Sequence, residues 1–146
     1  MKTLLLTIFM FFSVFKTSAQ VKTAIAQLQI AKIKTEMTKA KKAFEGIWYN
    51  KEANRYLSIS FDYGDYALIN DWIGESKNDA NIDAYKAFPK GDKLILPEEK
   101  EHHGTYCEMT ISKKRLRYQC KGGFLKTDQL TQSSYYVKIT KNRLKF

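Results

Sequence analysis

The sequence lacks the motifs by which most enzyme classes are recognised. It contains no Gly-x-Ser-x-Gly, no His-Glu-x-x-His and no phosphate-binding loop. Its two histidines, His102 and His103, are adjacent, and nothing marks a serine as the partner of either one in a catalytic triad. These absences predict a protein that is not an enzyme and that carries no cofactor.

Proline is also scarce, and apolar runs long enough to cross a membrane are missing. Two Pro stand beside a 14% content of aromatic residues, including nine Tyr, which is typical of a folded β-rich domain and not of a disordered chain. The longest apolar run, 4–15, falls short of the roughly 20 residues that span a bilayer. We therefore expect no transmembrane segment in the mature protein.

The first 19 residues have the three parts of a secretory signal. Lys2 supplies a positive charge, the run 4–15 is apolar, and Thr17-Ser18-Ala19 forms a small-residue site before Gln20. The sequence predicts a signal peptide over 1–19 and export to the periplasm or the exterior; an uncleaved N-terminal anchor is the alternative. Because the first cysteine is Cys107, we expect no lipid anchor.

The charge of the remaining chain is uneven. Residues 20–45 carry a net charge of +4, residues 46–112 of −5 and residues 113–146 of +9. Such asymmetry suggests an anionic partner, or a partner with complementary patches. The alternative is that the lysines only keep the surface soluble.

The two cysteines bracket a predicted β-hairpin. A two-residue turn at Lys113-Lys114 places Cys107 opposite Cys120 as a non-hydrogen-bonded pair, where the Cα atoms approach to about 4.5 Å. The same register puts the apolar residues and both cysteines on one face. We predict a disulfide in an oxidising compartment, with two free buried thiols as the alternative. The members of that face are Met109, Ile111, Leu116, Tyr118, Cys107 and Cys120.

The period of the apolar residues divides the mature chain. Residues 21–45 contain no Gly or Pro and have one apolar face at helical spacing, which predicts an amphipathic helix that ends at Gly46. This helix packs on its own domain, forms a coiled-coil seam or makes peripheral contact with an anionic membrane. The face consists of Ala26, Ile30, Ile33, Met37, Ala40 and Phe44.

From Gly46 the period changes to two, and turns recur every 8–12 residues, which is the spacing of an antiparallel barrel or sandwich. We predict a mainly β protein: a signal peptide (1–19), an amphipathic helix (20–45) and a barrel-like domain (46–146) of about eight short strands. The expected strands include 57–61, 66–74, 82–88 ended by Pro89, 93–96 ended by Pro97, the hairpin, and 135–140.

The tripeptide Gly46-Ile47-Trp48 resembles the Gly-x-Trp that opens the first strand of lipocalin-like (calycin) barrels. The resemblance implies eight meandering strands, a Trp48 that closes one end of the barrel, and an open end that accepts a small apolar ligand. The preceding helix is longer than that family has, and its later Thr-Asp-Tyr motif is missing. A barrel of roughly 100 residues can also be filled by its own side chains.

Candidate site residues follow from these expectations. The candidate aromatic lining residues of a barrel are Trp48, Tyr56, Tyr66, Trp72 and Tyr85; the alternative for each is plain core packing. His102 and His103, with Glu101, form the densest group of metal-capable side chains, although adjacent residues of an extended segment point to opposite sides. We expect a hydrated loop there, no metal, and no nucleic-acid partner for an exported protein.

Two functions follow from the sequence. The first is an exported, non-catalytic binding module, a small barrel that holds an apolar or amphipathic small ligand. The second is an envelope or secreted protein-interaction protein, such as an inhibitor or a toxin-neutralising immunity protein, whose charge steers its partner.

Overall fold

The computed structural model of the chain describes residues 2–74, 82–98, 105–121 and 130–140; side chains are described from Gln20 onward and, in the last strand, from Ser133. The chain divides into two units, Met1–Thr35 and Glu36–Phe146, which are described separately. In the part of the chain so described, no helical stretch combines the length and the apolar character that crossing a bilayer requires.

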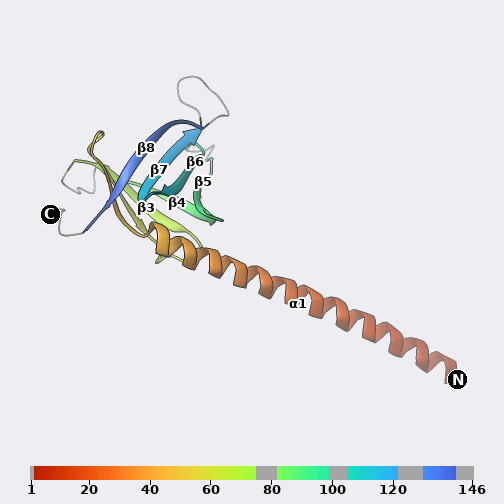
Figure 1. Ribbon diagram of the computed structural model, residues 1–146. Helices are drawn as coiled ribbons and strands as arrows, with labels where there is room; N and C mark the ends of the chain where they lie inside the picture. The colour runs from red at the N-terminus through yellow and green to blue at the C-terminus, as the bar shows by residue number, and fades with distance from the viewer. Residues whose placement is uncertain (1, 75–81, 99–104, 122–129, 141–146) are drawn as a thin grey trace. The chain divides into compact units, whose positions relative to one another are not determined.

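Eight antiparallel strands form a closed barrel in the second unit (Figure 1). Each strand pairs with the one before it, and the last returns to pair with the first, with Ile47 opposite Ile139. This confirms the predicted number of strands and decides for a barrel against a sandwich. The strands are β1 (Gly46–Asn50), β2 (Arg55–Ser60), β3 (Ala67–Ile73), β4 (Asp83–Lys90), β5 (Lys93–Leu96), β6 (Cys107–Ser112), β7 (Arg115–Lys121) and β8 (Leu130–Ile139).

The cysteine hairpin has the predicted register. Cys107 lies opposite Cys120, with 4.0 Å between their Cα atoms and a 2.05 Å bond between their sulfurs. Lys113 and Lys114 form the turn with φ angles of 50° and 63°, the left-handed conformation that two-residue hairpin turns require and that Gly or Asn usually supplies. The predicted disulfide and its face are therefore confirmed, and the turn is made by residues that adopt this conformation less readily.

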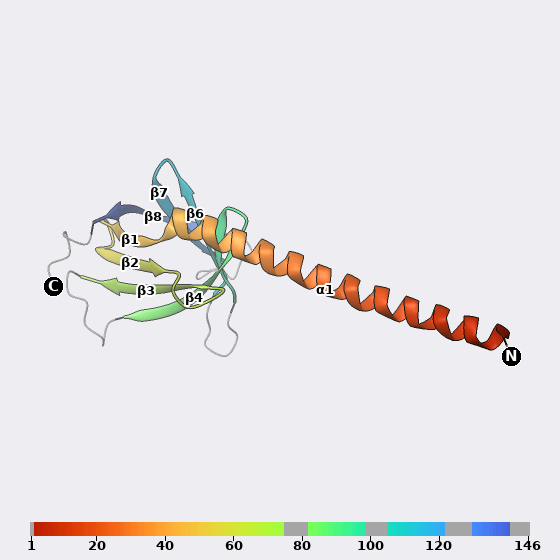
Figure 2. The same ribbon diagram turned by 90° about the horizontal axis from the view of Figure 1, so that it is seen from below.

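Inward-facing side chains fill the barrel with one apolar core. Leu57, Ile69, Met109 and Leu116 are at most 1% exposed, and they come from four different strands. Strand alternation explains the pattern, because every second residue points inward. Figure 2 shows β1 to β4 side by side in the curved sheet that forms one wall.

The final turns of helix α1 (Lys2–Phe44) belong to the barrel unit and close onto its core. Met37 packs against the core, whereas Ala40 and Phe44 are members of it. The indole nitrogen of Trp48 donates a hydrogen bond of 2.7 Å to the carbonyl oxygen of Phe44, one of the carbonyls that a helix end leaves without a helical partner. Trp48 thus joins the helix end to the first strand.

Gly46 is the residue at which the helix gives way to β1. Its φ of +129° lies in a region that glycine adopts readily and other residues rarely adopt. In addition, a Cβ atom at this position would lie 2.7 Å from the side-chain Cε of Lys138. The same Lys138 places its ammonium 5.4 Å from the centre of the Trp48 ring. A larger residue at position 46 would therefore displace the cation that covers Trp48.

The helical portion within Met1–Thr35 has exposed apolar side chains. The predicted helix is confirmed at its C-terminal end, but it extends back to Lys2 instead of beginning near residue 21. Ile30 is 66% exposed and Ile33 is 50% exposed, so the predicted apolar face packs only at its last three members. A helical conformation over 2–19 does not test cleavage before Gln20, which stays a prediction.

Two strand boundaries differ from the prediction. β4 continues through Pro89 to Lys90, because Pro89 faces Leu94 next to the closing pair of the turn and lies beyond the last pair with β3. Its missing N–H therefore removes no ladder hydrogen bond. β8 begins at Leu130 and not at residue 135. The register between β7 and β8 shifts near Lys121, and beyond this shift Lys121 pairs with Leu130, before a polar stretch that has no alternating strand pattern.

Candidate functional site in the barrel interior

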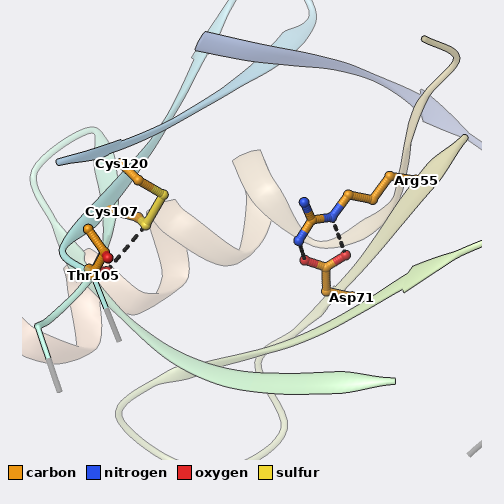
Figure 3. Close-up of a disulfide and its surroundings, with 5 residues drawn as sticks. All are labelled: Arg55, Asp71, Thr105, Cys107 and Cys120. Atoms are coloured by element: carbon orange, nitrogen blue, oxygen red, sulfur yellow. Dashed lines mark hydrogen bonds and ion pairs between the residues drawn. A yellow bond between two sulfur atoms is a disulfide. The ribbon is translucent and has the colours of Figure 1, made fainter. Parts of the chain in front are cut away.

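An ion pair lies inside the barrel between neighbouring strands. Nε of Arg55 on β2 donates to Oδ1 of Asp71 on β3 at 2.7 Å, and Nη2 donates to Oδ2 at 2.6 Å (Figure 3). Asp71 is 3% exposed, and the side chain of Arg55 is 37% exposed. The bidentate geometry satisfies the buried carboxylate with two charge-assisted hydrogen bonds, and these raise the pKa of Arg55.

Sequence analysis missed this pair because both faces of β3 carry apolar residues. Ala67, Ile69 and Asp71 share the inward face, while Leu68 and Trp72 stand on the other. The signal that could have revealed the pair lies in β2, where Arg55 falls on the same side of the strand as the buried Leu57 and Ile59. In the ladder between β2 and β3, Leu57 lies opposite Asp71, which brings Asp71 close to Arg55.

Three inward-facing tyrosines interact electrostatically with the ion pair. Tyr85 on β4, Tyr118 on β7 and Tyr136 on β8 each interact electrostatically with Asp71. Burial is the largest cause that raises the pKa of Tyr85 and of Tyr136 to about 12, and burial also raises the pKa of Tyr118. All three phenols are therefore neutral at physiological pH, and a hydrogen bond from Tyr85 to the Asp83 carboxylate also raises the pKa of Tyr85.

A pocket of about 250 Å³ opens next to these tyrosines. The cause is the short ladder between β4 and β5, which has three pairs and begins at Phe88, so that the first half of β4 diverges from its neighbour. Tyr85 and Tyr118 line the pocket and also interact electrostatically with Asp71. Its lining residues are Tyr85, Lys86, Leu96, Pro97, Thr105, Cys107 and Tyr118.

The pocket wall is apolar near the disulfide. Cys107 and Leu96 are opposite each other on β6 and β5 and are 5% and 6% exposed. The sulfur of Cys107 lies 3.3 Å from the carbonyl oxygen of Thr105, and Figure 3 shows this contact. Because a disulfide sulfur carries no proton, it is a contact and not a donated hydrogen bond. The pocket thus offers an apolar wall and, at the tyrosines, polar groups.

The structure separates the five aromatic residues that the sequence singled out. Trp48 is part of the inner core, and Tyr85 lines the pocket. Tyr56 and Trp72 lie on the opposite face of the sheet, where they stack at 5.3 Å between ring centres as directly paired cross-strand neighbours. Tyr66 stacks on Tyr63 at 6.4 Å at the surface. These five therefore do not share one lining, and a ligand contact by any of them stays a prediction.

The metal candidates Glu101, His102 and His103 lie outside the residues that the structure describes. Three other ion pairs occur among the described residues: Lys93 donates to Glu108 at 2.7 Å across β5 and β6, and Lys41 at the helix end approaches Glu45 at 3.3 Å and Asp62 at 3.6 Å. The hydrogen bond from Lys93 is the largest cause that lowers the pKa of Glu108. These pairs stabilise the barrel wall and leave the interior pair as the notable polar site.

Comparisons with known proteins found no matching protein family, no matching curated protein and no matching solved structure. The site is therefore interpreted from its own geometry.

Proposed function

We propose that this chain is an exported, non-catalytic binding module whose barrel holds a small amphipathic molecule in the pocket beside Tyr85 and Tyr118. One observation carries the proposal: the pocket combines an apolar wall with the phenols of Tyr85 and Tyr118 and the ammonium of Lys86. A few placed polar groups within an otherwise apolar cavity are the usual design of a small-molecule site.

The size of the pocket limits the ligand. At about 250 Å³ it falls below the roughly 300 Å³ at which drug-sized sites begin, and the core residues fill the rest of the barrel. The ligand is therefore a compact molecule, such as a small phenol or a short-chain polar lipid fragment, and not a long fatty chain. Its polar group accepts a hydrogen bond from the O–H of Tyr118, since burial raises the pKa of Tyr118 and keeps it protonated, whereas the Tyr85 hydroxyl is bonded to Asp83.

We also propose that the barrel is lipocalin-like and that the protein is exported. Support for the first comes from Gly46 and Trp48 at the start of β1 and from eight strands that meander in chain order. Support for the second comes from the signal-like pattern of residues 1–19 and from the Cys107–Cys120 disulfide, which is typical of an oxidising compartment.

Native mass spectrometry of protein purified gently from its own host tests the ligand. We expect a 1:1 adduct of at most a few hundred daltons. Thr105 is an exposed residue on the pocket rim, so Thr105→Trp fills the pocket without disturbing the core and is expected to abolish the adduct. Thr105→Ser is the matched control and is expected to retain it.

An adduct that survives Thr105→Trp would place the ligand elsewhere and overturn the assignment of this pocket. A stable complex with a second protein, without any small adduct, would favour the interaction function, such as an inhibitor or an immunity protein. The same spectrum measures the mass of the mature chain, and therefore tests cleavage before Gln20.

A further inference from the structure

A second hollow lies on the outer surface of the barrel and is cationic. It measures about 620 Å³ and spans the turn between β6 and β7 and the outward face of β7 and β8. We call it the basic groove. Its lining residues are Ser112, Lys113, Arg115, Arg117 and Tyr135.

The cations of the basic groove have no carboxylate partner among the residues that the structure describes. Arg117 donates its Nε hydrogen to the hydroxyl of Ser133 at 3.1 Å, and this is its only side-chain hydrogen bond within those residues. Neither 112–121 nor 133–140 contains an Asp or a Glu, although these segments hold six Lys and Arg. Elsewhere on the barrel Lys41, Arg55 and Lys93 each pair with a carboxylate.

Exposed apolar atoms lie beside these charges. Tyr135 is 53% exposed and Val137 is 45% exposed, and both stand on the outward face of β8 opposite β7. Arg117 is the direct cross-strand neighbour of Tyr135, and Arg115 that of Val137. Each arginine therefore lies next to an exposed apolar surface, and a partner that covers this surface would displace water from it.

We propose that the basic groove binds an acidic segment of a partner protein, with Arg115 and Arg117 holding carboxylates and Tyr135 contacting an apolar side chain between them. Arg and Tyr are the residue types that contribute most to protein–protein binding energy. The fork of a guanidinium matches a carboxylate in a bidentate arrangement. Single-stranded nucleic acid needs a row of stacking aromatics, and Tyr135 is the one large exposed aromatic on the described outer face of β7 and β8.

Within β8, Val137, Lys138 and Ile139 pair with β1, and the longer ladder is the one with β7. The lining of the basic groove consists of outward-facing side chains, and a partner would recognise these. This proposal does not depend on the pocket at Tyr85, which lies on the inner side of the sheet.

Titration of the mature protein with a short Glu-rich synthetic peptide that carries one central Leu tests the proposal, with nuclear magnetic resonance shifts and calorimetry as readouts. The shifts are expected to gather at 112–117 and 135, and binding is expected to weaken as salt is raised. The Arg115→Gln, Arg117→Gln double variant is expected to lose about tenfold or more in affinity. Both side chains are exposed, so the variant retains its fold.

The control is Lys51→Gln with Lys90→Gln, which removes the same charge from two other exposed positions. It is expected to bind the peptide almost as tightly as the wild type. Equal loss in both variants, or equal binding of a peptide in which Gln replaces every Glu, would show attraction by net charge alone and overturn the proposal. Anionic phospholipid vesicles that compete for the same shifts while the peptide causes none would also overturn it.

Discussion

Arginine has opposite surroundings on the two sides of this barrel wall. Inside, Arg55 makes two hydrogen bonds to Asp71, and both belong to the interior. Outside, Arg115 and Arg117 have no carboxylate partner in the described part of the chain. The difference indicates that the inner arginine contributes to the stability of the fold, whereas the outer arginines are free to serve recognition.

Removal of Arg55 is expected to have the largest effect. Arg55→Met leaves the Asp71 carboxylate buried without its cation, and we expect the free energy of unfolding to fall by about 3–5 kcal/mol. Asp71→Asn is expected to cost less, since the Arg55 side chain is 37% exposed and its guanidinium can turn to water. Urea unfolding followed by circular dichroism measures both.

The double variant Arg55→Met, Asp71→Leu separates charge from packing. It is expected to recover most of the stability that Arg55→Met loses, because no unpaired charge remains in the interior. A double variant as unstable as the single one would mean that packing around Arg55, and not the ion pair, stabilises this end of the barrel.

Alkaline pH gives a second measure of the interior. The pKa of Tyr136 is raised from 10.0 to about 12, so the folded state holds this proton more tightly than the unfolded state. The resulting stability is present below pH 10 and is lost as pH rises from 10 toward 12. Tyr136→Phe is expected to flatten this decline in unfolding measurements across that range, and the exposed-site variant Tyr135→Phe is the comparison. Identical pH profiles for the wild type and Tyr136→Phe would contradict the assignment.

The outer arginines are expected to have the smallest effect on stability. Arg115→Gln with Arg117→Gln should change the free energy of unfolding by no more than about 0.5 kcal/mol, since exposed side chains away from special contacts rarely contribute more. The same urea experiment checks this. A loss comparable to that of Arg55→Met would show that the two sides of the wall do not differ as proposed.

The sequence predicted the elements of this fold well where one pattern dominated. The hairpin register followed from Cys107 and Cys120 together with the alternation around them, and the structure reproduces each pair of that ladder. The periodicity also predicted the number of strands and a helix that ends before Gly46, and the helix of the structure ends at Phe44. In these segments polar and apolar residues occupy separate faces, so local sequence is sufficient.

The interior site could not be predicted from the sequence, because apolar residues lie on both faces of β3. In β3 the apolar Ile69 and Trp72 point to opposite sides, so alternation does not reveal which face is inside. Tyr56 and Trp72 looked like lining residues and instead stack on the outer face, while Asp71 took the inward position. Only the pairing of β2 with β3, a tertiary fact, places Arg55 beside its carboxylate.

The order of strand pairing has a consequence for folding during synthesis. Strands β2 to β8 each pair with the strand made just before them, so these hairpins form from short loops as the chain emerges. The seam between β1 and β8 differs, because Ile47 pairs with Ile139, which is synthesised about 90 residues later. Until then β1 exposes an unpaired edge, and the barrel is complete only when this one seam has closed.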